Sequence, residues 1–148
     1  MPDSLRVVLD PGVIVSAIVT PQGPTGQLIS AIRSTKVRPV VCPRLVEELT
    51  GVLHRPKFRT YVTVDEADRA VELLSRSAEH RDDPAEVPRC CRDPKDDYLI
   101  ALALDANAAG LVSGDRDLTT LVIDEVAVLT PRGLLDRLAA EDDEPTGA

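Results

Sequence analysis

Four acidic residues stand where a predicted strand passes into a helix, or within the first turns of that helix: Asp10, Glu48, Asp97 and Asp115. They are far apart in the chain, but ligands of parallel sheets bind beyond the carboxyl ends of the strands, where such side chains can meet. Clustered carboxylates bind hard cations such as Mg²⁺ and Mn²⁺, and these ions support phosphoryl chemistry. The pattern therefore predicts an acidic metal site at one edge of a sheet.

Two of these positions have competing structural explanations of unequal strength. Asp10 precedes Pro11, so it could simply cap a helix that has proline in its first turn. Asp93 and Asp96 suit the cap and first turn of the next apolar helix, and need no catalytic role. Asp97 lies one residue deeper in that helix, where a buried carboxylate must be paired, protonated or metal-bound. Asp97 is therefore the strongest functional candidate.

Two further acids follow the apolar segment LVS, which is predicted to be a strand. Asp117 could be the N-cap of the segment that follows, and Gly114-Asp115 could be an ordinary turn. In the functional interpretation Asp115 is a ligand just past the strand end, with the Ser113 hydroxyl beside it. Asp117 would then be an additional metal ligand.

Glu48 lies in a segment with the period of an amphipathic helix, which begins at Arg44. At about 100° per residue the apolar side chains fall on one arc of this helix. Glu47 falls opposite that arc, whereas Glu48 falls on its shoulder. A carboxylate on the shoulder can lean over the edge of the core into a cleft, which favours Glu48 as the site residue.

Apolar runs and turn residues predict an α/β chain in which strands alternate with helices. The predicted strands are residues 5–9, 37–41, weakly 78–81, 111–113 and 126–129; the predicted helices are 27–34, 44–53, 65–77, 93–109 and 131–138. Residues 13–19 are expected to be a first helical turn or a loop. Pro39 suggests an edge or irregular strand, and Gly110 suggests the end of the preceding helix. The pattern predicts one domain over residues 1–138 and an acidic, disordered tail over 139–148.

Composition restricts the function further. Of the 148 residues 43% are hydrophobic, only 2% are aromatic, and the net charge is −8. Scarce aromatic residues argue against base-stacking platforms, and the negative charge argues against a general nucleic-acid-binding surface. A metal ion can reverse the sign of an acidic pocket. Arg55, Lys57 and Arg59 form the best local basic segment for gripping an RNA backbone, although a solvated loop is the alternative.

The sequence lacks the motifs on which other kinds of catalytic or metal site depend. The chain has no GxSxG motif and no Walker loop. The cysteines are Cys42, Cys90 and Cys91, which have neither zinc spacing nor a disulfide framework, so they are expected to be reduced thiols in a cytoplasm. A strained vicinal disulfide between Cys90 and Cys91 is the less favoured alternative. His54 and His80 are expected at the surface, and no segment has the length of a membrane span.

Several blocks of the chain together resemble the PIN-domain family. They are VVLDPGVIVSAIV, CPRLVEELTGVLHRPKF, CRDPKDDYLIALALDANAAGLVSGDRDL and VLTPRGLLDRL, and they extend from about Arg6 to Leu138. The blocks are most similar to the branch of bacterial and archaeal toxins of toxin–antitoxin type. The resemblance implies a three-layer α/β/α fold with a central, mainly parallel sheet. It also implies a ribonuclease that depends on Mg²⁺ or Mn²⁺, with a small antitoxin as partner and a homodimeric assembly.

By position, the family's acidic quartet corresponds to Asp10, Glu48, Asp97 and Asp115, with Asp117 as an accessory acid. The mechanism expected from these residues is metal-assisted hydrolysis of RNA phosphodiesters. Asp10, Asp97 and Asp115 would hold one or two ions, and Glu48 would orient the attacking water or complete the second metal site. The family usually has Asp-Thr-Asn after the first strand, whereas this chain has Asp10 followed by proline and glycine. The missing amide is expected to lower the activity about 10–100-fold rather than abolish it.

Two other functions remain open at this point. A catalytically weakened PIN module could act as a dimeric binding or scaffold protein, which the missing amide favours. A small-molecule phosphohydrolase is the third reading, since it would use the same ions without needing a polymer.

Overall fold

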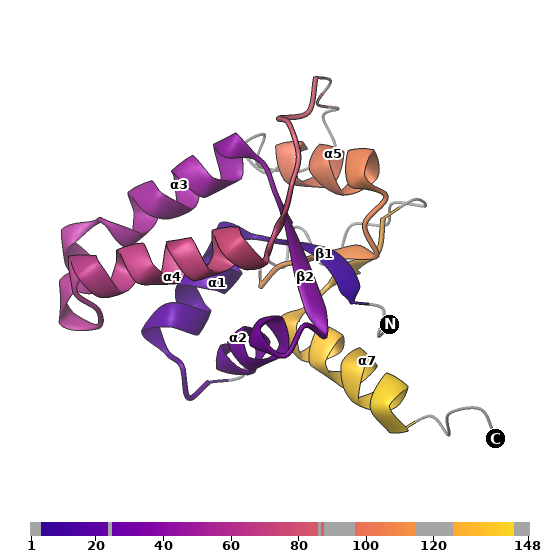
Figure 1. Ribbon diagram of the computed structural model, residues 1–148, viewed down its shortest axis with the longest axis horizontal. Helices are drawn as coiled ribbons and strands as arrows, with labels where there is room; N and C mark the ends of the chain where they lie inside the picture. The colour runs from indigo at the N-terminus through magenta and orange to yellow at the C-terminus, as the bar shows by residue number, and fades with distance from the viewer. Residues whose placement is uncertain (1–3, 24, 86, 88–96, 115–125, 144–148) are drawn as a thin grey trace.

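A five-stranded parallel sheet forms the centre of the molecule (Figure 1). The structure is a computed structural model that describes residues 4–23, 25–85, 87, 97–114 and 126–143. The strands are β1 (Leu5–Leu9), β2 (Val37–Val41), β3 (Glu79–His80), β4 (Gly110–Val112) and β5 (Val128–Leu129), in the order β3-β2-β1-β4-β5. The predicted parallel α/β fold is confirmed.

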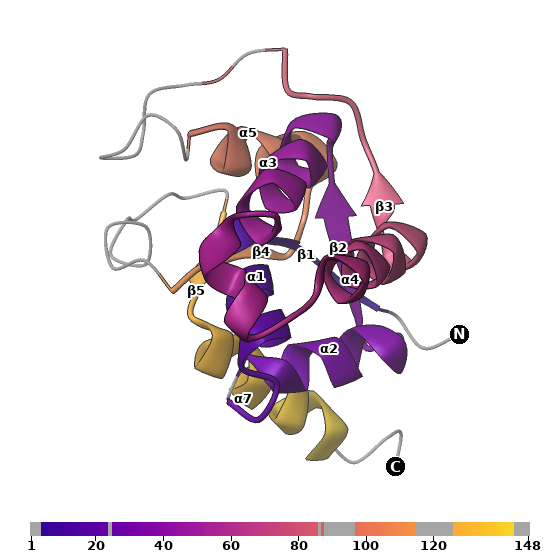
Figure 2. The ribbon, with the colours of Figure 1, turned by 90° about the vertical axis from the view of Figure 1, so that its left-hand side faces the viewer.

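Helices lie on both sides of this sheet, so the architecture has three layers. They are α1 (Pro11–Val19), α2 (Gly26–Arg33), α3 (Pro43–Leu53), the short 3₁₀ helix η1 (Pro56–Thr60), α4 (Val64–Ser77), α5 (Asp97–Ala106) and α7 (Pro131–Asp143). Figure 2 shows α5 on one side of the strands and α2 with α7 on the other. Helix α3 packs against both α1 and α4 beside the sheet. None of the helices in the described part of the chain could cross a membrane.

Aliphatic side chains build the core, as the composition predicts. Val7 and Val8 of β1 are completely buried, as expected for a central strand covered on both faces. Helix α3 turns Leu45, Leu49 and Leu53 inward, and this spacing is that of one helical face. Helix α5 is buried over nearly its whole first two turns. The two elements that carry Glu48 and Asp97 are therefore held firmly by packing.

The segment after β1 is more regular than expected, because residues 11–19 form the complete helix α1. Proline in the first turn needs no N–H partner, so it can begin a helix without cost. The Asp10 side chain accepts a hydrogen bond from the Gly12 N–H at 2.9 Å, which caps the new helix. The sequence correctly suggested the cap but underestimated the length of the helix.

Pro39 lies in an interior strand, so the expectation of an edge strand is wrong. It pairs in register with Val7 of β1, and β2 also carries β3 on its other side. Strand β3 is paired only with Val40 and Val41. The short partner strand leaves Pro39 outside that ladder, which explains how a residue without an N–H is accommodated.

The end of α5 also differs from the prediction. The helix ends at Ala106, and Asn107 has the left-handed conformation with φ 50°, which Asn tolerates better than most residues. Gly110 is instead the first residue of β4. A Cβ there would lie 2.7 Å from the carbonyl oxygen of Ala127, so glycine permits the close approach of the chain entering β5. At the carboxyl end of the chain, α7 continues to Asp143, into the region predicted to be a tail.

Candidate metal centre

Asp10 lies just beyond the carboxyl end of β1, between two neighbouring strands. Its N–H donates to the carbonyl oxygen of Val112 at 2.9 Å, which continues the β1–β4 ladder. Its Oδ1 accepts from the Gly12 N–H, and its Oδ2 accepts from the Ser113 hydroxyl at 2.9 Å. A carboxylate has about four acceptor positions. Each oxygen of Asp10 can therefore still bind a cation while it keeps its hydrogen bond.

Ser113 follows β4 directly and is completely buried. Its N–H donates to the Leu129 carbonyl oxygen at 2.9 Å, while its hydroxyl reaches Asp10. The sequence suggested that this hydroxyl would lie beside Asp115; the hydrogen bond within the described residues goes to Asp10. Ser113 thus orients the Asp10 carboxylate at the edge of the sheet.

Glu48 is drawn toward the beginning of α5 by a hydrogen bond. The hydroxyl of Tyr98, a residue that is 1% exposed, donates to Glu48 Oε2. Burial, and next the Glu48 carboxylate, raise the pKa of Tyr98 well above its ordinary value, so the phenol remains a neutral donor. Glu48 itself is exposed, as is Glu47. The contact supports the inference from the helical wheel that Glu48, rather than Glu47, is the acid directed toward the other site residues.

Asp97 is the first residue of α5 and is only 2% exposed, although it is a carboxylate. It directly precedes Tyr98, which contacts Glu48. Helix α5 packs on β1, β2 and β4, and it leads back through residues 107–109 into β4. Because helix and strand run in opposite directions here, α5 begins at the edge where β4 ends. Asp10, Glu48 and Asp97 therefore belong to one edge of the sheet.

The other predicted ligands, Asp115 and Asp117, lie outside the described residues, as do Cys90, Cys91, Asp93 and Asp96. Within the part of the chain that the structure describes, no three acidic, histidine or cysteine side chains are close enough together to form a metal site. The described acids supply oxygen ligands only, which is the chemistry that Mg²⁺ and Mn²⁺ prefer. The residues present therefore fit a hard divalent ion in ligand type.

The amino end of α3 lies at the same edge and is held from the loop that follows β3. Cys42 provides no side-chain cap; instead, Asp83 Oδ1 accepts from the Arg44 N–H at 2.9 Å. Burial is the main reason that the pKa of the Cys42 thiol is raised to about 11; a backbone hydrogen bond from Leu45 opposes this rise, and the Asp83 side chain adds to it. The Arg44 guanidinium lies over the Tyr98 ring, 4.2 Å from its centroid.

Tyr98, Arg44 and Asp83 were not among the residues predicted for the site. Each of them contacts a site residue, or another of the three, that is remote in the chain. The local sequence pattern does not reveal such contacts. For Tyr98 a signal was nevertheless present. Tyr98 directly follows Asp97 and precedes the apolar run LIALAL, so it was expected to be buried. A buried tyrosine hydroxyl needs a hydrogen-bond partner.

The basic segment predicted to bind RNA is engaged in different ways. The Arg59 guanidinium turns inward and donates to the Leu53 carbonyl oxygen at the end of α3. Its Nε and Nη1 are buried and have no hydrogen-bond partner among the residues described. Lys57 lies over the Phe58 ring at 5.1 Å, and Arg55 is exposed. Because its guanidinium binds the backbone at the end of α3, Arg59 stabilises this helix end and does not offer a free surface charge.

The basic segment lies beyond the carboxyl end of α3, whereas Asp10 is next to the strand end that leads into the amino end of this helix. The eleven residues of α3 span about 16 Å at the usual rise per residue. Glu48 lies near the middle of that helix and Cys42 at its start. RNA that contacts Arg55 or Lys57 would have to extend along the whole helix to reach Asp10.

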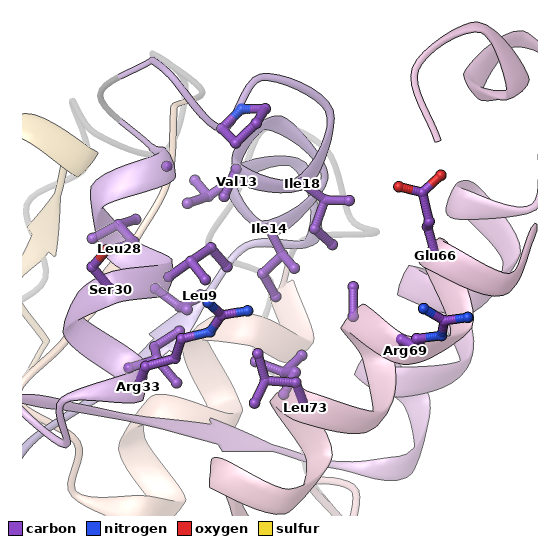
Figure 3. Close-up of a pocket in the computed structure, with 17 residues that line it drawn as sticks. Leu9, Val13, Ile14, Ile18, Leu28, Ser30, Arg33, Glu66, Arg69 and Leu73 are labelled. Carbon is purple, nitrogen blue, oxygen red and sulfur yellow. The ribbon is translucent and has the colours of Figure 1, made fainter. Parts of the chain in front are cut away.

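A separate cavity of about 590 Å³ lies between α1, α2 and α4. Figure 3 shows apolar side chains from these helices facing one another across it, including Ile18 and Leu73. Arg33, Arg69 and Glu66 also line the cavity. Neither Asp10 nor Glu48 nor Asp97 contributes to it. Its apolar walls suit a hydrophobic partner better than a phosphate.

The two histidines are used structurally. His54 Nε2 lies 2.7 Å from Asp68 Oδ1, and His80 Nε2 lies 2.6 Å from the Ser75 carbonyl oxygen. Both residues are exposed, as expected.

Comparisons with known proteins agree with this fold. An uncharacterised protein from Methanocaldococcus jannaschii, MJ1680, is 28% identical over 119 residues, which cover 79% of this chain and 75% of the relative. The crystal structure of PAE2754 from Pyrobaculum aerophilum superposes with a TM-score of 0.64 at 19% identity, over 93% of this chain and 90% of that one. At this identity the likeness concerns the fold alone.

The decisive match is to a family model. The PIN-domain model matches residues 6–117, which is more than half of the chain and includes Asp10, Glu48, Asp97 and Asp115. PIN domains are generally nucleases and typically use divalent metal ions. The chain belongs to the PIN-domain family.

Proposed function

We propose that this protein is an endoribonuclease that uses Mg²⁺ or Mn²⁺ to hydrolyse RNA phosphodiesters. The observation that supports this most strongly is the burial of the Asp97 carboxylate beside Tyr98, which binds Glu48. Asp97 begins α5 at the edge of the sheet to which Asp10 and Glu48 also belong, and carboxylate oxygens are the ligands that Mg²⁺ and Mn²⁺ prefer. In a nuclease-type fold, a cation held by these acids has a clear use.

In this proposal Asp10, Asp97 and Asp115 hold the ion, and Asp117 is an accessory ligand. When bound, the ion would supply a more acidic water and neutralise charge that develops on the phosphate. The Glu48 Oε1 atom would accept a proton from the attacking water, while Oε2 stays bound to the Tyr98 hydroxyl. Attack forms a new P–O bond and breaks the bond to the leaving oxygen. No protein nucleophile is needed.

The orientation of Asp10 comes from its two hydrogen bonds, which fix both carboxylate oxygens. Helix α1 begins here with a glycine at position 12, where family members usually have asparagine. Loss of that amide would weaken the ordering of Asp10 and reduce the rate about 10–100-fold. The Ser113 hydroxyl is the second support that remains.

The test is single-turnover cleavage of a labelled RNA in Mn²⁺ by the parent and by Asp10→Asn and Asp97→Asn. Each substitution keeps the shape of the side chain and removes the charge, so each is expected to reduce cleavage at least 100-fold. Glu47→Gln is a matched control, because Glu47 is an exposed acid next to Glu48 that has no assigned role. Equal rates for all four proteins would refute the proposal.

A scaffold protein with a decayed site is the second candidate, favoured by the proline and glycine that follow Asp10. Calorimetric titration with Mn²⁺ separates the two. The nuclease requires saturable binding that is lost in Asp97→Asn, whereas the scaffold requires none. Turnover of a small phosphate ester without any action on RNA would instead indicate a phosphohydrolase.

We also propose that the protein is the toxin of a toxin–antitoxin pair and that its antitoxin docks in the cavity between α1, α2 and α4. The apolar walls and the two arginines suit a helix with an apolar face and acidic flanks. A synthetic peptide of this kind should bind the parent and fail to bind Ile18→Glu. Since Ile18 is remote from Asp10, that variant should still cleave RNA if it folds normally.

A further inference from the structure

Arg44 is an exposed cation that is fixed in place at the acidic edge. Its guanidinium lies 4.2 Å from the centroid of the Tyr98 ring, and its N–H donates to Asp83 at 2.9 Å. Both the backbone and the side-chain end are therefore restrained. A stacked guanidinium keeps its N–H donors in the plane, pointing away from the ring, where they can bind another group.

The donors of Arg44 have no acceptor among the residues that the structure describes. No ion pair or side-chain hydrogen bond of its guanidinium is formed there. Two other arginines differ, because Arg6 and Arg81 are both bound to Glu79. Arg59 is turned inward. Arg44 thus combines exposure, a fixed orientation and unused donors.

Tyr98 contacts both Arg44 and Glu48, and it is next to Asp97 in the chain. One face of its ring carries Arg44, its hydroxyl donates to Glu48, and its neighbour in α5 is the buried Asp97. Arg44 is two residues past Cys42, which lies opposite Asp10 if the register of β1 and β2 is continued past the strand ends. The cation therefore lies at the rim of the proposed centre rather than at the far end of α3.

The exposed amino end of α3 does not offer an alternative anion site. Asp83 already accepts the N–H of Arg44, and its charge favourably faces the positive end of the helix. A phosphate approaching these amides would meet that carboxylate. The side chain of Arg44, directed over Tyr98, is the group that can reach a phosphate.

We propose that Arg44 binds a phosphate of the RNA substrate next to the scissile bond, with Tyr98 as the positioning residue for both Arg44 and Glu48. The inference rests on the proposed ribonuclease function and deepens it. A protein with a net charge of −8 needs a local cation to hold a polyanion at an acidic site. Arginine suits this task because its planar group binds phosphate oxygens with two donors.

The test measures binding separately from cleavage. A fluorescent single-stranded RNA is titrated in Ca²⁺ instead of Mn²⁺, with gels to verify that it stays intact, at salt concentrations from about 50 to 200 mM. Arg44→Ala should weaken binding about 10-fold and reduce the steepness of the salt dependence by about 0.7, the value of one lost contact to a single strand. Arg44→Lys should keep the salt dependence and lose part of the affinity.

Arg76→Ala is the matched control. It removes the same charge from the exposed end of α4. This end leads into the start of β3, so it lies at the edge of the sheet opposite to the edge that carries the acids. If Arg44→Ala and Arg76→Ala have the same affinity and salt dependence as the parent, the inference about Arg44 is overturned while the ribonuclease function stands. If the parent itself neither binds nor cleaves RNA, the proposed function fails and this inference fails with it.

Tyr98→Phe distinguishes the two contacts of the tyrosine. It keeps the ring under Arg44 and removes the hydroxyl that holds Glu48. In Mn²⁺ it should lower kcat about 10-fold and leave KM unchanged, whereas Arg44→Ala should mainly raise KM. A general structural defect would instead change both constants in both variants, which would overturn the assigned roles.

Discussion

The Ser113 hydroxyl donates to Asp10 Oδ2 at 2.9 Å and so joins the carboxyl ends of β1 and β4. The two residues are separated by 103 positions in the chain. The contact depends on the parallel register of the two strands, in which Leu9 lies opposite Val112. An acid that also caps α1 is thereby held in one orientation at the edge of the sheet.

Ser113→Ala should reduce Mn²⁺-dependent RNA cleavage about 10-fold, because Asp10 loses one of its two supports. The free energy of unfolding should fall by only about 1 kcal/mol, the usual contribution of one hydrogen bond. Single-turnover cleavage and urea unfolding measure the two effects. Ser34→Ala, which removes a hydroxyl far from the site, serves as the control. Parent-level cleavage by Ser113→Ala would show that the hydroxyl does not position Asp10.

Gly12→Asn should raise the cleavage rate about 10-fold by returning an amide next to Asp10. A Cβ at this position would lie 3.5 Å from Asp10 Oδ1, which is an ordinary contact, so a side chain fits there. Gly12→Ala is the matched control, since it stabilises the helix without supplying an amide. Steady-state rates should rank Gly12→Asn above both Gly12→Ala and the parent. Equal rates for the two variants would indicate that the amide does not matter here.

Glu79 should contribute to stability in a manner that depends on pH. The hydrogen bonds from Arg6, opposed by burial and assisted by Arg81, lower the pKa of Glu79 from 4.5 to about 2. A carboxylate with a lowered pKa stabilises the fold above its unfolded pKa, and that stability is lost as the pH falls from about 4.5 toward 2. Glu79→Gln should therefore lower the free energy of unfolding at pH 7 by about 1–2 kcal/mol. Its stability should change less than that of the parent between pH 4.5 and 3.

Urea unfolding at pH 7, 4.5 and 3 provides the measurement for this ion pair. Glu72→Gln is the control, because the Glu72–Arg76 pair is 63% and 73% exposed and should contribute almost nothing. If Glu79→Gln resembles Glu72→Gln at every pH, then the contact with Arg6 does not stabilise the fold.

Cys42 should be unreactive in the folded protein. Its thiol is 1% exposed, and burial is the main reason that its pKa is raised to about 11, so very little thiolate exists at pH 8. Treatment with iodoacetamide followed by peptide mass spectrometry should find Cys42 unmodified in buffer and modified in urea. Rapid labelling of Cys42 in buffer would mean that the amino end of α3 opens readily.

Local pattern predicted those features that depend on local chemistry. Apolar runs located the strands, and helical spacing identified the buried leucines of α3. The position of Asp97, one residue deeper in the helix than Asp96, correctly indicated a buried carboxylate. In each case, whether a side chain is buried follows from the spacing of apolar residues within its own helix or strand.

The features that sequence did not predict depend on contacts between distant segments. Tyr98 reaches Glu48 across 50 positions, and Arg59 turns toward Leu53 because the short η1 helix folds back on the end of α3. Gly110 marks a close approach to Ala127 rather than a helix end. Such contacts are decided by how the elements pack, which composition and periodicity do not encode.

The central claim is that Asp10 and Asp97 share one divalent ion. The most direct test is a crystal of the protein soaked in Mn²⁺ and measured by anomalous diffraction, which locates manganese independently of the model of the protein. The account predicts an anomalous peak within coordination distance, about 2.0–2.6 Å, of carboxylate oxygens from both residues. Saturating Mn²⁺ with no peak at either carboxylate, or with Asp10 and Asp97 too far apart to share an ion, would contradict it.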